Sequence, residues 1–264
     1  MRIAAWNVNS INARKDRLEP FLSRTRPDVL AIQELKCVDE KVPVEYLKEL
    51  GYHTEAIGQK TYNGVAILSR QKPDAVIKGF DDGYDADNAR LIACQFGDVH
   101  VVCVYCPNGQ AVGSEKYEYK LEWFKNLDKF MRSHYSPKDK VVLLGDFNIA
   151  PDDRDIHDPK KWEDDILCSK AERDSLQRLL DFGLHDTYRS LHQEGGVFSW
   201  WDFRTQSFAV NRGLRIDLVL ATKPLLDRCE EAWIDREARK GESQKVKPSD
   251  HAPVFAEFTA AETH

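Results

Sequence analysis

Apolar residues gather in eight short runs along the 264-residue chain, and each run has the length of a β-strand. The runs are rich in β-branched and aliphatic residues and are bounded by turn formers, which is typical of strands. Several are apolar at almost every position, which indicates strands covered on both faces. The predicted strands span residues 2–6, 28–33, 64–69, 90–96, 99–105, 140–145, 214–221 and 252–258.

Three segments between these runs show the periodicity of an amphipathic helix instead. In residues 114–131 the apolar side chains recur every three or four positions, and residues 11–22 follow the same pattern. Residues 170–181 are preceded by Ser169, and Glu172 follows three positions later, which is the spacing of a capping box. The chain therefore predicts an α/β protein in which helices cover β-sheets.

The organisation of the chain predicts one domain over residues 1–264. It has no linker rich in Ser, Gly or Pro, and its 42% hydrophobic content is enough for one large core. Two long connections, 147–168 and 201–213, are typical of loops that bind a ligand. The N-terminus shows no signal-peptide core and no segment reaches transmembrane length. The six cysteines are scattered, so we expect free thiols, as in a cytosolic protein.

Polar side chains of a few chemical kinds end or interrupt the apolar runs. A single Asn or Asp at a strand end is usually a turn residue. Asp217, however, lies inside a predicted strand, where a carboxylate is costly unless it is paired, and His251 is a candidate partner. The repetition at several strands predicts that these side chains converge on one site. The candidates are Asn7, Glu34, Tyr105, Asn108, Asp146, Asn148, Asp217, Asp250 and His251.

The residue types narrow the chemistry of this site. Carboxylates and carboxamides around Glu34 offer oxygen ligands, which suit Mg²⁺ or Mn²⁺ better than zinc. The chain has no HExxH motif, nucleophile elbow or phosphate-binding glycine loop, which excludes the corresponding protease, α/β-hydrolase and P-loop classes. The net charge of −6 argues against binding of nucleic acid by bulk electrostatics, but a divalent metal can supply local positive charge. Hydrolysis of a phosphate ester fits this combination.

Eight motifs of the chain resemble the exodeoxyribonuclease III family of abasic-site endonucleases, within the endonuclease/exonuclease/phosphatase superfamily. The resemblance runs from about residue 2 to residue 258 and is strongest to the bacterial branch. It implies a four-layer α/β/β/α sandwich of the deoxyribonuclease I type, with two packed mixed β-sheets flanked by helices. The motifs are WNVNS (6–10), AIQELK (31–36), YNGVAILSR (62–70), VYCPNG (104–109), GDFNIAP (145–151), FSWWDFR (198–204), NRGLRIDLVLA (211–221) and PSDHAPV (248–254).

The resemblance also implies roles for the catalytic candidates. Asp146 would orient and deprotonate the attacking water, and Asn148 would hold the water or the phosphate. His251 would contact a phosphate oxygen while Asp217 orients it and keeps it charged, and Tyr105 would hold the phosphate. Whether His251 or Asp146 is the general base stays open at this point.

Further residues are implied around this centre. Glu34 would ligate Mg²⁺, for which Mn²⁺ can substitute, with Asn7 and Asp250 beside it. Some family members carry Asp where this chain has Asn9, which bears on a second metal position. An apolar pocket for an abasic sugar would be lined by Trp200, Leu214 and Ile216, unless all three are ordinary core residues. Contacts to DNA or phosphate would come from Asn108, Asn211, Tyr62, Arg90 and Arg204.

The implied function is a magnesium-dependent DNA repair phosphodiesterase. It would cleave 5′ to abasic sites in double-stranded DNA and trim 3′ ends as a 3′–5′ exonuclease and 3′-phosphatase. Its partner would be duplex DNA with abasic sites or blocked 3′ ends, and it would act as a monomer at the nucleoid in the bacterial cytoplasm. The alternatives are an inositol-lipid phosphatase, a sphingomyelinase-like enzyme, and a catalytically silent relative that binds nucleic acid.

Overall fold

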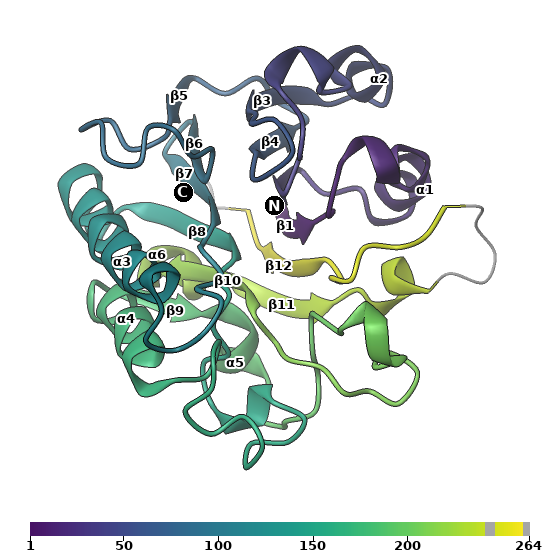
Figure 1. Cartoon of the computed structure of the whole chain (residues 1–264). Helices are drawn as coiled ribbons and strands as arrows, with labels where there is room; N and C mark the ends of the chain where they lie inside the picture. The colour runs from purple at the N-terminus through teal and green to yellow at the C-terminus, as the bar shows by residue number, and fades with distance from the viewer. Residues whose placement is uncertain (241–245, 261–264) are drawn as a thin grey trace.

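Two six-stranded β-sheets pack face to face in the computed structural model, which describes residues 1–240 and 246–260 (Figure 1). The first sheet has the strand order β11 (Cys229–Ile234), β12 (Val254–Phe258), β1 (Arg2–Asn7), β2 (Val29–Gln33), β4 (Val65–Ser69) and β3 (His53–Ile57). The second has the order β5 (Ala75–Lys78), β6 (Leu91–Phe96), β7 (Val99–Tyr105), β8 (Lys140–Asp146), β10 (Asp217–Thr222) and β9 (Leu184–Asp186).

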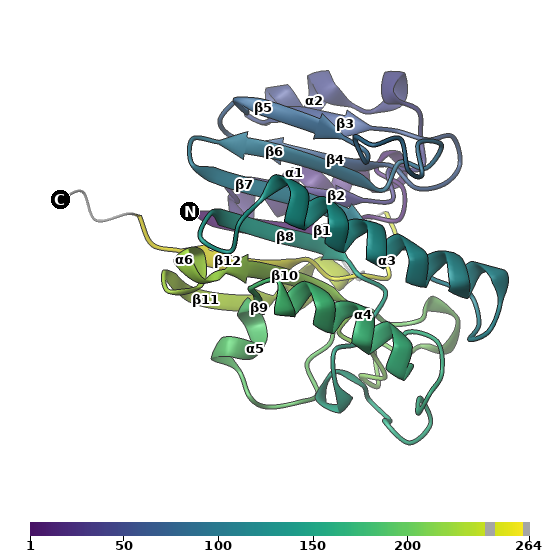
Figure 2. The same cartoon turned by 90° about the vertical axis from the view of Figure 1, so that its left-hand side faces the viewer.

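Helices cover the outer faces of both sheets, so the expected α/β/β/α sandwich is confirmed (Figures 1 and 2). On the first sheet lie α1 (Lys15–Thr25) and α2 (Val44–Glu49), and on the second lie α3 (Glu115–His134) and α4 (Lys170–Asp181). The shorter helical elements are α5 (Thr187–Leu191), α6 (Lys223–Leu226), η1 (Asn12–Arg14), η2 (Asp39–Lys41), η3 (Asp153–Asp155), η4 (Phe203–Thr205) and η5 (Arg236–Arg239).

The central strands are apolar throughout because each of their faces is buried in a different layer. In β1, Ile3 packs in the core between the two sheets, whereas Ala4 packs in the core under α1 and α2. In β8, Val142 packs between the sheets, and Val141 packs in the core under α3 and α4. Successive residues of a strand point to opposite faces, so a central strand in this sandwich needs apolar residues at both.

Several predicted boundaries differ from the structure. The strand expected over residues 214–221 begins only at Asp217, because Leu214 makes isolated bridges to Ile156 and Trp200 outside the sheet. The helix expected over residues 11–22 is the short turn η1 followed by α1, and the helix expected over 114–131 extends to His134. Strands β3, β5, β9 and β11 were not predicted at all.

Other expectations concern the chain as a whole. All six cysteines are free thiols, as expected. Among the described residues, no helix has the length and apolar character needed to cross a membrane. A single domain over residues 1–264 stays a prediction.

Candidate active site

Strand ends from both sheets meet at one end of the sandwich. In the second sheet Asp146, the last residue of β8, is in register with Tyr105 of β7 on one side and with Asp217 of β10 on the other. In the first sheet Asn7 ends β1, and Glu34 directly follows β2. Asn7 donates a hydrogen bond from Nδ2 to each of two carboxylates, Glu34 at 2.8 Å and Asp146 at 2.9 Å. The site therefore spans the interface between the sheets.

Gly145 explains how β8 delivers Asp146 to this position. Its φ of 142° lies in a region that favours glycine, and a Cβ added there would lie 2.0 Å from the backbone oxygen of Val104. Two backbone hydrogen bonds hold the chain at Asp146 and at the next residue, Phe147. Cys106 donates from its N–H to that carbonyl at 2.9 Å, and Phe147 donates to the Ile216 carbonyl at 3.0 Å. The backbone around Asp146 is thus fixed by both neighbouring segments.

Asp217 and His251 form a buried pair beside Asp146. His251 Nδ1 lies 2.8 Å from Asp217 Oδ2, and His251 Nε2 lies 3.7 Å from Asp146 Oδ2. Burial disfavours the charged imidazole, but the carboxylates of Asp217 and Asp146 outweigh it and raise the pKa of His251 to about 10. Burial also raises the pKa of the Asp146 carboxyl, an effect that the charge on His251 opposes.

Ser199 supports this pair and was not singled out from the sequence. Its fully buried hydroxyl donates to Asp217 Oδ2 at 2.6 Å and accepts from the backbone N–H groups of Ile216 and Asp217, each at 3.0 Å. Its carbonyl accepts from Ala252, the residue after His251, at 2.7 Å. The FSWW motif contains this serine, but its role depends on a long-range contact that the sequence does not display.

Amide and phenol groups complete the side of the site formed by the second sheet. Asn108 Nδ2 donates to Asn148 Oδ1 at 3.3 Å, and Asn148 Nδ2 donates to the Cys106 carbonyl at 2.9 Å. The Arg90 guanidinium lies 4.9 Å from the centre of the Tyr105 ring. Burial, together with the carboxylates of Glu34 and Asp146, raises the pKa of Tyr105 well above its ordinary value, so its hydroxyl is neutral and can donate.

The oxygen-rich part of the site includes a lysine. Lys36 Nζ lies 3.0 Å from Glu34 Oε2 and donates to Asn9 Oδ1 at 2.7 Å. Asn9 Nδ2 in turn donates to Asp250 Oδ1 at 3.0 Å, and Trp200 Nε1 donates to Asp250 Oδ2 at the same distance. The ammonium of Lys36, another residue missed in the sequence, therefore links Glu34 to the Asn9–Asp250 pair.

One group of side chains in the site could hold a metal ion. Possible ligand atoms of Glu34, Asp146 and His251 lie within 4.8 Å of one another, and the protonated state of His251 leaves the two carboxylates as the ligands. The carboxylate oxygens of this group suit a hard divalent cation. Asn7, expected beside the metal, presents its amide nitrogen to the carboxylates, and its Oδ1 accepts from the Asn9 backbone at 3.0 Å.

Three predicted DNA contacts lie outside this cluster. Tyr62 and Arg204 have largely exposed side chains, and Arg204 forms an ion pair with Asp202. The Asn211 oxygen accepts from Trp201 and Arg236, and one hydrogen of its amide nitrogen is donated to the Gly196 carbonyl. Binding of DNA by these three residues stays a prediction.

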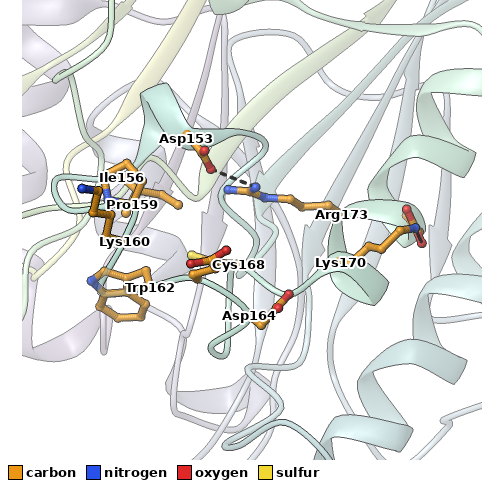
Figure 3. Close-up of a pocket in the computed structure, with 11 residues that line it drawn as sticks. Asp153, Ile156, Pro159, Lys160, Trp162, Asp164, Cys168, Lys170 and Arg173 are labelled. Atoms are coloured by element: carbon orange, nitrogen blue, oxygen red, sulfur yellow. Dashed lines mark hydrogen bonds and ion pairs between the residues drawn. The ribbon is translucent and has the colours of Figure 1, made fainter.

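The predicted abasic pocket is only partly open. Leu214 and Ile216 are each 1% exposed and pack in one apolar cluster with Ile156 and Cys168, whereas Trp200 is partly exposed beside it. A cavity of about 550 Å³ borders this cluster and is lined in part by Ile156 and Cys168 (Figure 3). Leu214 and Ile216 thus pack as core residues, and their contact with a sugar stays a prediction.

Comparison with known proteins places the chain among nucleases. Residues 4–251 match the model of the Endonuclease/Exonuclease/phosphatase family. Exodeoxyribonuclease III of Haemophilus influenzae is 37% identical over 270 residues, which cover 98% of this chain and 100% of the relative. The structure of the 3′ phosphatase NExo from Neisseria, bound to a product DNA hairpin, superposes with a TM-score of 0.93 at 43% identity, covering 98% and 100% of the two chains. An AP endonuclease from Archaeoglobus fulgidus superposes with a TM-score of 0.93 at 34% identity and the same coverage.

Proposed function

Because the chain belongs to the endonuclease/exonuclease/phosphatase family, we propose that it is a metal-dependent hydrolase of phosphate esters in DNA. The substrates we propose are duplexes with abasic sites, cleaved on the 5′ side, and duplexes with blocked 3′ ends. The observation that carries the proposal is the cluster of Glu34, Asp146 and His251, with Asp217 behind the histidine. Action as a monomer and a place in the bacterial cytoplasm stay predictions.

Asp146 is the better candidate for the general base. The Asp217 carboxylate holds His251 Nδ1, and the raised pKa keeps the imidazole protonated at neutral pH, so His251 has no free site to accept a proton. The raised pKa of Asp146 makes its ionised form a stronger base towards water. Hydrogen bonds from the Asn148 backbone and the Asn7 side chain aim its two oxygens. We therefore assign proton abstraction from the attacking water to Asp146.

Four donors in the cluster can stabilise the charge that develops on the phosphate. His251 Nε2 carries a proton and is not held by Asp217, and the neutral Tyr105 hydroxyl is a second donor. Asn108 and Asn148 each use one amide hydrogen within the described residues, which leaves one for a phosphate oxygen. Fixed donors of this kind act on the transition state without reorganisation.

The residues present also fit a divalent cation. Glu34 would hold it, together with a carboxylate oxygen of Asp146 or Asp250, and we propose Mg²⁺, with Mn²⁺ as a substitute. When bound, the ion would supply positive charge beside the scissile phosphate. Asn7 would then align Glu34 and Asp146 through its amide nitrogen instead of acting as a ligand.

A second candidate function is 3′-end processing without incision at abasic sites. The tight packing of Leu214 and Ile216 favours it, because these two side chains leave almost no apolar surface open to a bare sugar. In this case the same catalytic groups would act on a terminal phosphate.

One substrate panel distinguishes these functions. Purified protein is incubated with Mg²⁺ or with excess chelator on an internal abasic duplex, a duplex ending in a 3′-phosphate, an intact duplex and a phosphoinositide. The first proposal predicts metal-dependent cleavage of the abasic duplex and release of the 3′-phosphate. Release of 3′-phosphate alone supports the second candidate. Turnover of the phosphoinositide only, or full activity in chelator, would contradict both.

A further inference from the structure

A fully buried ion pair joins the two helices that cover the second sheet. Lys120 of α3 and Glu172 of α4 form this pair, and both side chains are 0% exposed. The Lys120 ammonium also donates to two backbone carbonyls, that of Asn148 at 2.6 Å and that of Asn108 at 3.1 Å. Its three N–H groups thus serve three acceptors, and two of these belong to the amide residues of the candidate site.

Glu172 anchors the other end of the pair to the beginning of α4. Its carboxylate accepts from the backbone N–H groups of Leu167 and Ser169, each at 3.0 Å, and from the Ser169 hydroxyl at 2.7 Å. This is the capping box that starts the helix, whose first residues border the cavity in Figure 3. The pair therefore connects the loops after β7 and β8 to a rigid helix end.

Stability does not account for such a pair. Removal of two charges from water is costly, and replacing a buried ion pair with apolar residues of similar volume is often neutral or stabilising. The charge fixes local geometry instead, because an ammonium ion with three acceptors holds the carbonyls of Asn108 and Asn148 in one arrangement. Asn108 and Asn148 also contact each other through their side chains. A shift of either carbonyl would therefore move both amides relative to the phosphate site.

We propose that Lys120, held by Glu172, is a positioning residue that sets the two amides of Asn108 and Asn148 for the transition state. This inference rests on the proposed function for the role of the amides, but not for the contacts themselves. A misplacement of catalytic groups by about 1 Å can cost roughly 10²-fold in rate. Loss of the ammonium should therefore lower kcat and change KM little.

The test replaces both charges together. The variant Lys120→Met with Glu172→Leu removes the pair without leaving an unpaired buried charge. It should fold but melt below the wild type, because the N–H groups of Leu167 and Ser169 lose their acceptor. We expect kcat on the 3′-phosphate duplex to fall at least tenfold. The matched control, Lys125→Met with Glu122→Leu, removes an exposed ion pair from α3, the helix that carries Lys120, and should leave kcat unchanged.

A mutant cycle with Asn148→Ala separates positioning from general disturbance. If the pair acts through this amide, Asn148→Ala should cost clearly less in the double variant than in the wild type. An unchanged kcat in the folded double variant, or a penalty for Asn148→Ala equal in both backgrounds, would overturn the proposal.

Two additions keep the test decisive. If the apolar pair does not fold, Lys120→Gln with Glu172→Gln keeps a polar contact, but the two amide hydrogens of Gln can serve only two of the three acceptors. Its kcat should lie between those of the wild type and the apolar variant, and a wild-type kcat would overturn the proposal.

The side-chain amide resonances of Asn108 and Asn148 should shift in these variants whether or not the wild type cleaves DNA. Shifted resonances with an inactive wild type would contradict the proposed function alone, and unshifted resonances would contradict the positioning role.

Discussion

At the scale of single residues, the chemical type of the site residues was easier to predict from the sequence than the contacts that hold them in place. Asp146, Asp217 and His251 were identified because polar side chains recur at several strand ends and Asp217 lies inside an apolar run, and the structure brings the three together. Ser199 and Lys36 were missed because serine and lysine are unremarkable in any sequence. Their importance comes from partners that are distant in the sequence: Asp217 is 18 residues from Ser199, and Asn9 is 27 residues from Lys36.

The charge on His251 can be measured directly in the metal-free protein. The pKa of its imidazole is raised from about 6.5 to about 10, so it stays protonated at pH 7. Because the folded value lies above the unfolded one, its contribution to stability is present below about pH 6.5 and is lost as pH rises through about 10. Asp217→Asn should lower this pKa. An NMR titration of the His251 imidazole in chelator, for the wild type and for Asp217→Asn, measures the two pKa values. A His251 signal that titrates near 6.5 in the wild type would contradict this account.

Ser199 should matter through its hydroxyl and not through its volume. Ser199→Ala removes the donor to Asp217 Oδ2, which should release the carboxylate and lower kcat roughly 10- to 100-fold. Ser199→Thr keeps the hydroxyl and should restore most of the rate. Single-turnover kinetics with a thermal melt make the comparison, and equal rates for the Ala and Thr variants would show that the hydroxyl does not position Asp217.

At the scale of elements, the sequence predicted the interior of each sheet and missed its edges. The four missed strands, β3, β5, β9 and β11, are the four edge strands of the two sheets. An edge strand is only partly covered, so it does not need an apolar run, and the burial of β5 and β11 shows this. The start of β10 was misplaced because Leu214 and Ile216 alternate with Arg215 as in a strand, but these two apolar side chains pack into a loop cluster instead.

The close approach of Gly145 in β8 to Val104 in the neighbouring strand β7 gives a prediction at this scale. Gly145→Ala would force a side chain into the Val104 carbonyl and strain a backbone that favours glycine, which should cost at least about 1–3 kcal/mol. Gly97→Ala is the matched control, because its φ is also positive at 60° but nothing lies within 4 Å of the added Cβ. Thermal melts should show the larger fall for Gly145→Ala. A smaller fall than in the control would mean that β8 tolerates a side chain beside Asp146.

At the scale of the whole molecule, the site exists only because the two sheets pack together. The first sheet supplies Asn7 and Glu34, and the second supplies Tyr105, Asp146 and Asp217. No run of sequence contains this interface, which is why the strand ends suggested a common site but not its geometry. The chain carries a net charge of −6, so the proposed binding of DNA would depend on the local positive charge of this site and not on the overall charge.

Metal binding reports on the part of the site contributed by the first sheet. Glu34→Gln should weaken binding of Mn²⁺ in calorimetry, because it removes a carboxylate ligand. Lys36→Met should strengthen it roughly tenfold, since a positive charge 3.0 Å from Glu34 repels a cation even in a water-like dielectric. Lys41→Met serves as the exposed control and should change little. Equal affinity in all four proteins would place the metal away from Glu34.

The measurement that tests the central claim most directly is the single-turnover rate of Asp146→Asn in Mg²⁺, beside the wild type. The substitution keeps the shape of the side chain and removes its basicity, so the rate on the abasic and 3′-phosphate duplexes should fall ~10²–10⁴-fold. DNA affinity should be equal or higher, because one negative charge leaves the phosphate site, and the melting temperature shows whether the fold is kept. A folded Asp146→Asn protein that cleaves at a rate near the wild type would show that this carboxylate is structural and that the catalytic site lies elsewhere.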